Sequence, residues 1–309
     1  MIRDLVRETT LHPQNLVFPI FVKQGLSTPA AIASMPGIYQ HSLKSIVAEV
    51  GDCVEKGVRS FILFGIPEKK DDCGSGASDA NGIVQNTIKA LKDKFPDILL
   101  ISDVCLCEYT DHGHCGVLDK RGNVENDATV ELLTQASLSL AQAGADMIAP
   151  SDMMDGRVRA IRQTLDNNGY ASTPIMSYAV KYASSFYGPF RDAAESTPKS
   201  GDRKSYQMDV ANVREALLEA KLDEAEGADI LMVKPAMSCL DIISRLSQQT
   251  NLPLAAYQVS GEFAMIEAAA KNGWINREKA ILESLISIKR AGAQVIVTYF
   301  AREVMTFLC

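Results

Sequence analysis

Three cysteines lie within eleven residues of one another, at the end of an apolar run of the chain. Cys105 and Cys107 are two positions apart, so on a strand their side chains would point to the same face. The loop that follows could return Cys115 to them as a third thiolate. Three thiolates without an obvious fourth ligand predict a tetrahedral zinc site with one position open to water or substrate. The alternatives are thiols that only pack as small apolar groups, and a site in which His112 or His114 is a further ligand or a proton-transfer group.

Two lysines stand in apolar surroundings that predict amine chemistry. Lys234 follows Met232 and Val233 at a position where a buried strand would carry Val or Ile, and lysine is rarely buried unless it is paired or functional. Lys181 lies at the end of the preceding apolar run. Neighbouring strands would bring both amines into one pocket, where burial and mutual repulsion lower the pKa and leave a free amine that can attack a carbonyl group. The alternative for Lys181 is a strand-end lysine that reaches solvent.

Residues 184–207 form the longest stretch without clear periodicity and are rich in Gly, Pro and Ser. Long irregular loops in compact domains often cover active sites. Arg191, Arg203 and Lys204 give this loop positive charge, and arginine binds carboxylates through two parallel hydrogen bonds. We therefore expect a lid that binds an acidic substrate. The alternative is a solvated surface loop.

Eight short apolar or β-branched runs alternate with segments long enough for helices. The runs are 17–22, 61–66, 99–106, 146–150, 174–182, 230–235, 254–260 and 295–300. The amphipathic segments are 43–56, 81–94, 128–143, 157–167, 212–226, 240–250 and 277–291. Glycine recurs where a helix must end before a strand, at positions 144, 227 and 292. The alternation predicts an α/β protein with a single (β/α)₈ TIM barrel, and an open doubly wound sheet is the alternative.

Polar side chains gather at the C-terminal ends of the predicted strands, where barrel enzymes place their active sites. The N-terminal ends are mostly Gly, Ala and Pro, and this asymmetry predicts an enzyme. The polar residues are Asp103, Cys105, Cys107, Ser151, Asp152, Lys181, Lys234, Ser260 and Tyr299.

The composition limits the other functions that the chain could have. Its 309 residues are 47% hydrophobic and 22% charged, as in a globular protein with a substantial core, and the formal net charge of −7 argues against a nucleic-acid surface. No apolar stretch reaches the roughly 18–20 residues of a membrane-spanning helix, and the first residues lack the pattern of a signal peptide. Seven cysteines, an odd number, then predict a reducing compartment and a cytoplasmic location.

Four motifs are jointly very specific. They are Cys-Leu-Cys followed by His-Gly-His-Cys-Gly (105–116), Phe-Tyr-Gly-Pro-Phe-Arg (186–191), Met-Val-Lys-Pro-Ala (232–236) and Tyr-Gln-Val-Ser-Gly-Glu (257–262). With them the chain closely resembles the porphobilinogen synthase (5-aminolaevulinate dehydratase) family over nearly its whole length. The resemblance implies a (β/α)₈ barrel lyase that condenses two 5-aminolaevulinate molecules into porphobilinogen with loss of two waters, in tetrapyrrole (haem) biosynthesis.

The resemblance also implies roles for individual residues. Lys234 would form a Schiff base with one substrate, Lys181 could hold the other in the same way, and Asp103 would be an active-site acid close to the metal. One substrate carboxylate would bind to Arg191 and Arg203. The remaining implied positions are Gln207 beside these arginines, Ser260 and Tyr299 for the other carboxylate, Cys105, Cys107 and Cys115 for zinc, and Glu219 for an allosteric magnesium ion near a subunit interface.

Members of this family usually carry an Arg-rich N-terminal arm that embraces a neighbouring subunit and helps to build an octamer. Residues 1–14 would form a shortened arm ahead of a single catalytic domain over residues 1–309. We expect a homo-octamer, and a hexamer or dimer is the alternative. A rival enzyme is a Schiff-base aldolase or lyase, which would need Lys234 but neither three thiolates nor a second lysine. A rival of another class is a catalytically silent barrel that binds zinc or serves as an assembly partner.

Overall fold

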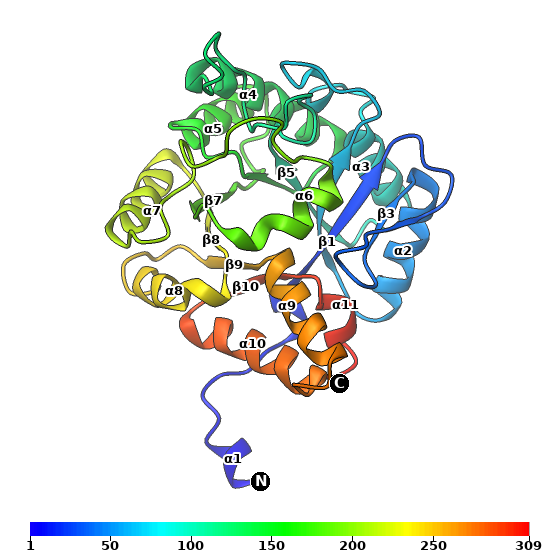
Figure 1. Ribbon diagram of the computed structural model, residues 1–309, viewed down its shortest axis with the longest axis vertical. Helices are drawn as coiled ribbons and strands as arrows, with labels where there is room; N and C mark the ends of the chain where they lie inside the picture. The colour runs from blue at the N-terminus through cyan, green and yellow to red at the C-terminus, as the bar shows by residue number, and fades with distance from the viewer. Residues whose placement is uncertain (309) are drawn as a thin grey trace.

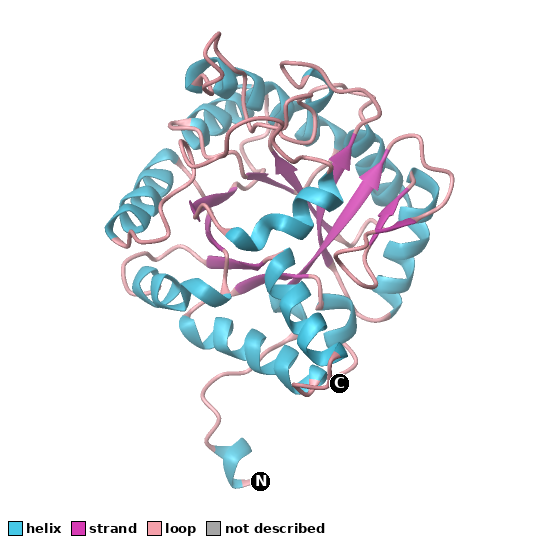
Figure 2. Ribbon diagram, in the orientation of Figure 1, coloured by secondary structure: helices cyan, strands magenta, loops and turns pink. Residues whose placement is uncertain are grey.

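The computed structural model describes residues 1–308. Eight parallel strands lie in the order β6-β5-β4-β1-β10-β9-β8-β7, and parallel pairing of Ile148 with Ile175 joins the two ends, so that the sheet closes into a barrel (Figure 2). The predicted (β/α)₈ TIM barrel is confirmed. The strands are β1 (Leu16–Lys23), β4 (Ser60–Ile66), β5 (Leu99–Val104), β6 (Met147–Pro150), β7 (Met176–Lys181), β8 (Ile230–Lys234), β9 (Leu254–Gln258) and β10 (Val295–Thr298).

The strands of the barrel fall into two groups of four. Strands β1, β4, β5 and β6 pair through continuous ladders, and β7, β8, β9 and β10 pair with one register shift, between Ser177 and Val180 in the β7–β8 ladder. Between the groups the pairing is short. β1 meets β10 only at Leu16 and Val17, and β6 meets β7 at the single bridge from Ile148. The cysteine motif follows β5, a strand of the first group, whereas both lysines lie in the second group.

Helices surround the barrel in the ribbon view (Figure 1). Gly144 and Gly227 end two of them with φ of 104° and 103°, a left-handed conformation that favours glycine and that the recurring glycines predicted. A short β2 (Ala30–Ala31) and β3 (Tyr39–His41) extend the sheet beside β1. The helices are α1 (Ile2–Leu5), α2 (Leu43–Glu55), α3 (Ile83–Lys94), α4 (Asn126–Ala143), α5 (Arg157–Asn167), α6 (Gly188–Ala194), α7 (Arg214–Glu226), α8 (Leu240–Leu246), α9 (Ser260–Lys271), α10 (Arg277–Ala291) and α11 (Ala301–Val304).

Four helices, α1, α6, α9 and α11, lie where the sequence pattern predicted none. Helix α6 is a single short element inside the lid. Helix α9 begins at Ser260, although the predicted strand ran to that residue. The apolar Val259 extends the strand pattern, but the Glu262 carboxylate accepts the backbone N–H of Val259 at 2.8 Å and of Met237 at 2.7 Å. This cap begins a helix at the point where the hydrophobic pattern alone indicates a longer strand.

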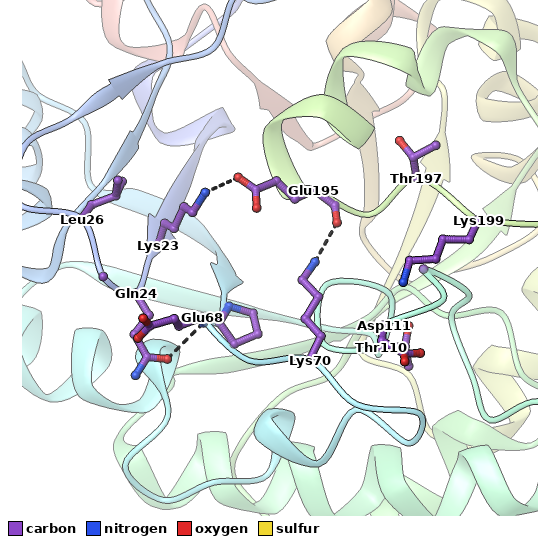
Figure 3. Close-up of a pocket in the computed structure, with 13 residues that line it drawn as sticks. Lys23, Gln24, Leu26, Glu68, Lys70, Thr110, Asp111, Glu195, Thr197 and Lys199 are labelled. Atoms are coloured by element: carbon purple, nitrogen blue, oxygen red, sulfur yellow. Dashed lines mark hydrogen bonds and ion pairs between the residues drawn. The ribbon is translucent and has the colours of Figure 1, made fainter.

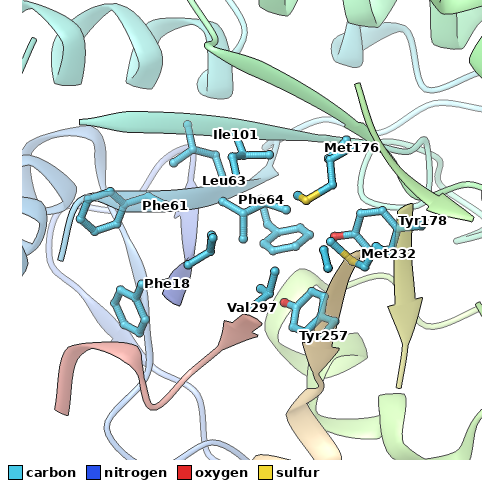
Figure 4. Close-up of a cluster of buried hydrophobic side chains, with 14 of the residues drawn as sticks. Phe18, Phe61, Leu63, Phe64, Ile101, Met176, Tyr178, Met232, Tyr257 and Val297 are labelled. Atoms are coloured by element: carbon cyan, nitrogen blue, oxygen red, sulfur yellow. The ribbon is translucent and has the colours of Figure 1, made fainter. Parts of the chain in front are cut away.

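Buried apolar side chains from all eight barrel strands belong to one large cluster. Phe18, Phe61 and Tyr257 point into it from β1, β4 and β9 (Figure 4). The N-terminal segment with α1 instead extends away from the barrel (Figure 1), and Ile2 and Leu5 are 79% and 85% exposed. Among residues 1–308, no helix has the length and apolar character needed to cross a bilayer.

Candidate active site

Two lysines lie side by side at the C-terminal ends of β7 and β8. Lys181 pairs in register with Lys234, and both side chains are buried, at 4% and 5% exposure. Their Nζ atoms lie 5.8 and 5.1 Å from the centroid of the Tyr178 ring. The structure therefore brings the two predicted amines to the same aromatic ring, and both are buried.

Aromatic rings surround the Lys234 amine. The ring centroids of Tyr257, Tyr178, Phe190 and Tyr187 lie 4.5, 5.1, 5.1 and 5.2 Å from its Nζ atom. Burial, followed by the positive charge of the neighbouring lysine, lowers the pKa of Lys234 to about 7. A large fraction of this amine is consequently unprotonated at neutral pH, which is the form that attacks a carbonyl group.

A buried carboxyl group lies close to both amines. Asp103 Oδ2 accepts a hydrogen bond from Ser151 Oγ at 2.9 Å, and the Ser151 carbonyl accepts one from Lys181 Nζ. Burial raises the pKa of Asp103, and the charge of Glu108 raises it further, whereas Lys234 and Lys181 oppose this shift. Within the described chain, Asp103 Oδ1 has no hydrogen-bond partner. An acid with a raised pKa beside an amine with a lowered one can exchange a proton with a bound molecule near neutral pH.

The three predicted cysteines form a buried cluster beyond the end of β5. Their Sγ atoms all lie within 4.8 Å of one another, and the side chains of Cys105, Cys107 and Cys115 are 4%, 3% and 0% exposed. Hydrogen bonds from the other two thiols, followed by the Arg203 charge, hold the pKa of Cys115 well below its usual range. Three converging soft donors fit a thiophilic divalent ion. The geometry therefore suits the predicted metal site.

Three further polar residues lie near the thiols, and one of them, Glu108, was not predicted from the sequence. Glu108 is 3% exposed and accepts a hydrogen bond from Cys107 Sγ at 3.2 Å, a contact for which the sequence holds no signal. The rings of His112 and His114 make hydrogen bonds elsewhere. His112 Nε2 lies 3.1 Å from the Asp72 carbonyl oxygen, and both ring nitrogens of His114 contact the lid.

The predicted lid, residues 184–207, brings cationic and amide groups to the barrel mouth. Arg203 is 6% exposed, and its Nη2 donates to the carbonyls of Gly113 and Ser196 at 2.8 and 2.6 Å. Burial, followed by the nearby Arg203 charge, lowers the pKa of Arg191. Across the described residues, the buried Nε atoms of both arginines and Nε2 of Gln207 lack a hydrogen-bond acceptor. Unpaired buried donors of this kind fit an anionic ligand.

Ser260 and Tyr299 lie on the β9–β10 side of the mouth. Ser260 Oγ accepts the backbone N–H of Phe190 at 2.9 Å and donates to the Phe186 carbonyl at 3.4 Å, so in this structure it holds the lid. The Tyr299 hydroxyl lies 3.0 Å from that of Tyr257, whose ring contacts the Lys234 amine. The structure thus connects both predicted residues to the lysine pocket through their immediate neighbours.

Glu219 lies apart from the lysines. It lines a cavity of about 330 Å³ together with Asp155, Glu215 and Gln207. Burial, followed by the charge of Asp155, raises the pKa of Glu219. The structure therefore places this predicted ligand among other carboxylates and beside the end of the lid.

A second set of contacts holds the lid on the β1–β4 side of the mouth, next to a cavity of about 610 Å³ (Figure 3). Glu195 ends α6 with φ of 51°, and its carboxylate accepts hydrogen bonds from Lys23 and, at 3.2 Å, from Gln40. Lys70 donates to the Glu195 backbone carbonyl at 2.7 Å. These residues are far apart in the sequence, and no motif connects them.

Comparisons with known sequences agree over the whole chain. A family model described as Delta-aminolevulinic acid dehydratase matches residues 1–307. The Delta-aminolevulinic acid dehydratase of Halalkalibacterium halodurans is 55% identical over 99% of this chain and 93% of its own length. The protein of the same description from Bacillus subtilis is 54% identical over 99% of this chain and 94% of its own length.

Solved structures give the same result. A crystal structure of delta-aminolevulinic acid dehydratase (porphobilinogen synthase) from Toxoplasma gondii, in complex with the reaction product porphobilinogen, superposes with a TM-score of 0.97. It is 45% identical and covers 99% of this chain and 88% of its own. Dihydropteroate synthase from Xanthomonas albilineans superposes with a TM-score of 0.52 at 12% identity, which reflects a likeness of fold alone.

Proposed function

Because the chain belongs to the delta-aminolevulinic acid dehydratase family, we propose that it is a porphobilinogen synthase. This lyase condenses two 5-aminolaevulinate molecules into porphobilinogen and releases two waters, in tetrapyrrole (haem) biosynthesis. The observation that carries the proposal is the pair of buried, register-matched lysines beside a cluster of three thiols. A Schiff-base aldolase would require only one of these lysines and no thiol cluster.

The unprotonated Lys234 amine attacks the ketone carbon of one substrate. The carbinolamine then loses one water and leaves a C=N bond to the lysine. Lys181 binds the ketone of the second substrate in the same way. Asp103 is connected to Lys181 through Ser151, its charge also acts on Lys234, and it can give or take the protons that these dehydrations require.

The lid binds one of the two substrate carboxylates. Arg191 and Arg203, with Gln207 beside them, have unpaired buried donors that a carboxylate would satisfy. Ser260 and Tyr299 bind the carboxylate of the other substrate, which requires the Ser260 hydroxyl to exchange its lid contacts for a ligand. Closure of the lid excludes water and strengthens each of these polar interactions.

Cys105, Cys107 and Cys115 would hold zinc, whose preference for thiolate donors fits this set. When bound, the ion supplies Lewis-acid polarisation of a substrate oxygen at its open position. Glu219, with the adjacent carboxylates of Asp155 and Glu215, would hold a magnesium ion that modulates activity.

We further propose one catalytic domain over residues 1–309, with residues 1–14 as an arm that contacts a neighbouring subunit in a homo-octamer. The exposed apolar side chains of α1 support this role. The formal net charge of −7 and the seven cysteines support a cytoplasmic enzyme without nucleic-acid or membrane partners.

The test is pyrrole formation from 5-aminolaevulinate under reducing conditions, with added zinc and after chelation. Borohydride reduction in the presence of substrate should fix an adduct on Lys234, located by mass spectrometry of peptides. We expect zinc-dependent pyrrole, its loss in Lys234→Ala, and an unchanged zinc content in that variant. Pyrrole that survives complete chelation would reject zinc, and substantial turnover by Lys234→Ala would reject the Schiff base on this residue.

A further inference from the structure

A series of hydrogen bonds connects Cys115 to the lid. The backbone N–H of Cys115 donates to the Tyr206 hydroxyl oxygen at 3.3 Å, that oxygen lies 3.1 Å from His114 Nδ1, and His114 Nε2 lies 2.9 Å from the Ser200 carbonyl oxygen. A carbonyl oxygen can only accept, so in the neutral imidazole Nε2 carries the proton and Nδ1 accepts one from Tyr206. In this tautomer Cys115 donates to Tyr206, Tyr206 donates to His114, and His114 donates to the Ser200 carbonyl.

The residues before Cys115 also contact the lid. The His112 carbonyl accepts the backbone N–H of Lys199 at 3.0 Å, and the Gly113 carbonyl accepts Arg203 Nη2 at 2.8 Å. Gly113 has φ of +77°, and a Cβ atom built on it would lie 2.6 Å from the Thr197 carbonyl oxygen. Each residue from 112 to 115 is thus bound to the lid, and at Gly113 the two backbones are in contact.

Tyr206, which takes part in these hydrogen bonds, also contacts the thiols. Tyr206 is partly buried and packs against the cluster of Cys105, Cys107 and Cys115. Its ring therefore contacts the candidate metal site, while its hydroxyl joins the backbone of one ligand to the lid. Groups that orient metal ligands from outside the coordination sphere commonly change metal affinity by about 10–100-fold when they are removed.

We infer that metal binding at the three thiols and closure of the lid are linked through Tyr206 and loop 112–115. An ion that fixes Cys115 fixes the loop, and the loop fixes the lid. A closed lid in turn holds Cys115 in place for the ion, since coupling between two binding events is reciprocal. Tyr206 is a positioning residue in this scheme. The inference rests on the proposed metal site and is independent of the reaction.

The test compares the wild type with Tyr206→Phe, which keeps the ring against the thiols and removes the hydroxyl. Tyr170→Phe, in the loop after α5, is the matched control. Zinc affinity is measured by competition with a chromophoric chelator, without substrate. Trypsin cleavage in the lid, at Lys199, Arg203 and Lys204, is measured with and without zinc. We expect zinc to slow this cleavage in the wild type and in the control.

For Tyr206→Phe we expect zinc affinity to fall by about 10-fold, and the protection of the lid by zinc to shrink by a similar factor. Gly113→Ala provides a second route, because its Cβ would lie too close to the Thr197 carbonyl of the lid, while the three thiols and Tyr206 are not themselves substituted. Gly113→Ala should also lower zinc affinity.

Two results would overturn the linkage: equal lid cleavage with and without zinc in the wild type, or wild-type zinc affinity in both folded variants. Neither measurement involves substrate, so a failure here would leave the proposed reaction standing. Conversely, a protein that shows the linkage but forms no pyrrole would reject the reaction alone.

Discussion

Lys181 and Lys234 occupy equivalent register positions on β7 and β8, but their surroundings differ. Lys181 donates to the Ser151 carbonyl, whereas Lys234 is surrounded by four aromatic rings and has no carboxylate ion-pair partner in the described chain. Aromatic faces stabilise a cation less than a carboxylate would, so burial dominates and the pKa falls. The two paired lysines therefore lie in different surroundings, one hydrogen-bonded to a backbone carbonyl and the other enclosed by aromatic rings.

The first prediction concerns the repulsion between the two amines. In Lys181→Met the like charge is removed, so the ammonium form of Lys234 is favoured and its pKa should rise above about 7, by about one unit. The pH midpoint for borohydride-trapped adduct on Lys234 should rise accordingly, with less free amine at pH 7. Lys181→Arg keeps the charge and should keep the midpoint. Identical midpoints in both variants would contradict this explanation.

Beneath the lysines, a buried charged group connects elements of the barrel. Arg157 at the start of α5 is 2% exposed and donates to Asp223 on α7, to Ser177 Oγ and to the Tyr178 carbonyl on β7. It also lies 3.7 Å from Asp152, beyond the end of β6. The β7–β8 register shifts between Ser177 and Val180, so Arg157 binds β7 at its irregular point. The network therefore fixes the strand that carries Lys181.

We predict that Arg157→Met lowers the free energy of unfolding by about 3–5 kcal/mol, because it leaves buried carboxylates without their cation. Arg159→Met, at an exposed position of the same helix, is the control and should change it by less than about 0.5 kcal/mol. Urea denaturation at neutral pH measures both. A cost for Arg157→Met no larger than that of the control would show that the network contributes nothing to stability.

The contacts of Glu195 with the barrel rim should govern how often the lid opens. The Lys23–Glu195 pair is partly exposed, so its loss is worth only about 0.2–1 kcal/mol, or up to about five-fold in opening. Glu195→Gly removes the carboxylate but tolerates φ of 51°, whereas Glu195→Ala removes it and keeps the unfavourable backbone conformation. Trypsin cleavage of the lid should therefore be fastest in the alanine variant and slowest in the wild type. Cleavage rates equal to that of the wild type in both variants would refute the assignment.

For the molecule as a whole, the exposed N-terminal segment is the feature that the barrel does not explain. Ile2, Leu5 and Val6 are 79%, 85% and 67% exposed, and together they form an apolar surface outside the core. If this arm contacts another subunit, Leu5→Asp should lower the mass of the assembly measured by analytical ultracentrifugation. Leu43→Asp, at an exposed position of α2, should leave it unchanged. An equal mass for all three proteins would exclude a role for the arm.

The sequence predicted those parts of the molecule that depend on regular geometry. Alternation along strands placed Lys181 and Lys234 at the barrel mouth, because the side-chain direction on a strand follows from its period. For Cys105 and Cys107 the strand argument was wrong, because β5 ends at Val104 and both cysteines lie in the turn that follows it. The contacts of Glu108, Tyr206 and Glu195 could not be predicted in this way. They join loops that are distant along the chain, and the conformation of such loops is set by tertiary contacts rather than by a repeating pattern.

The two groups of barrel strands have a consequence for the origin of the site's chemistry. In the group of β1 and β4–β6, strand β5 carries Asp103 and is followed by the thiols, whereas the group of β7–β10 carries both amines. Only Leu16 and Val17 on one side and Ile148 on the other pair across the division. The two buried amines and the three thiols are thus encoded by separate halves of the polypeptide. A small sliding of one half against the other would alter the distance between these two kinds of chemistry while leaving the internal geometry of each intact.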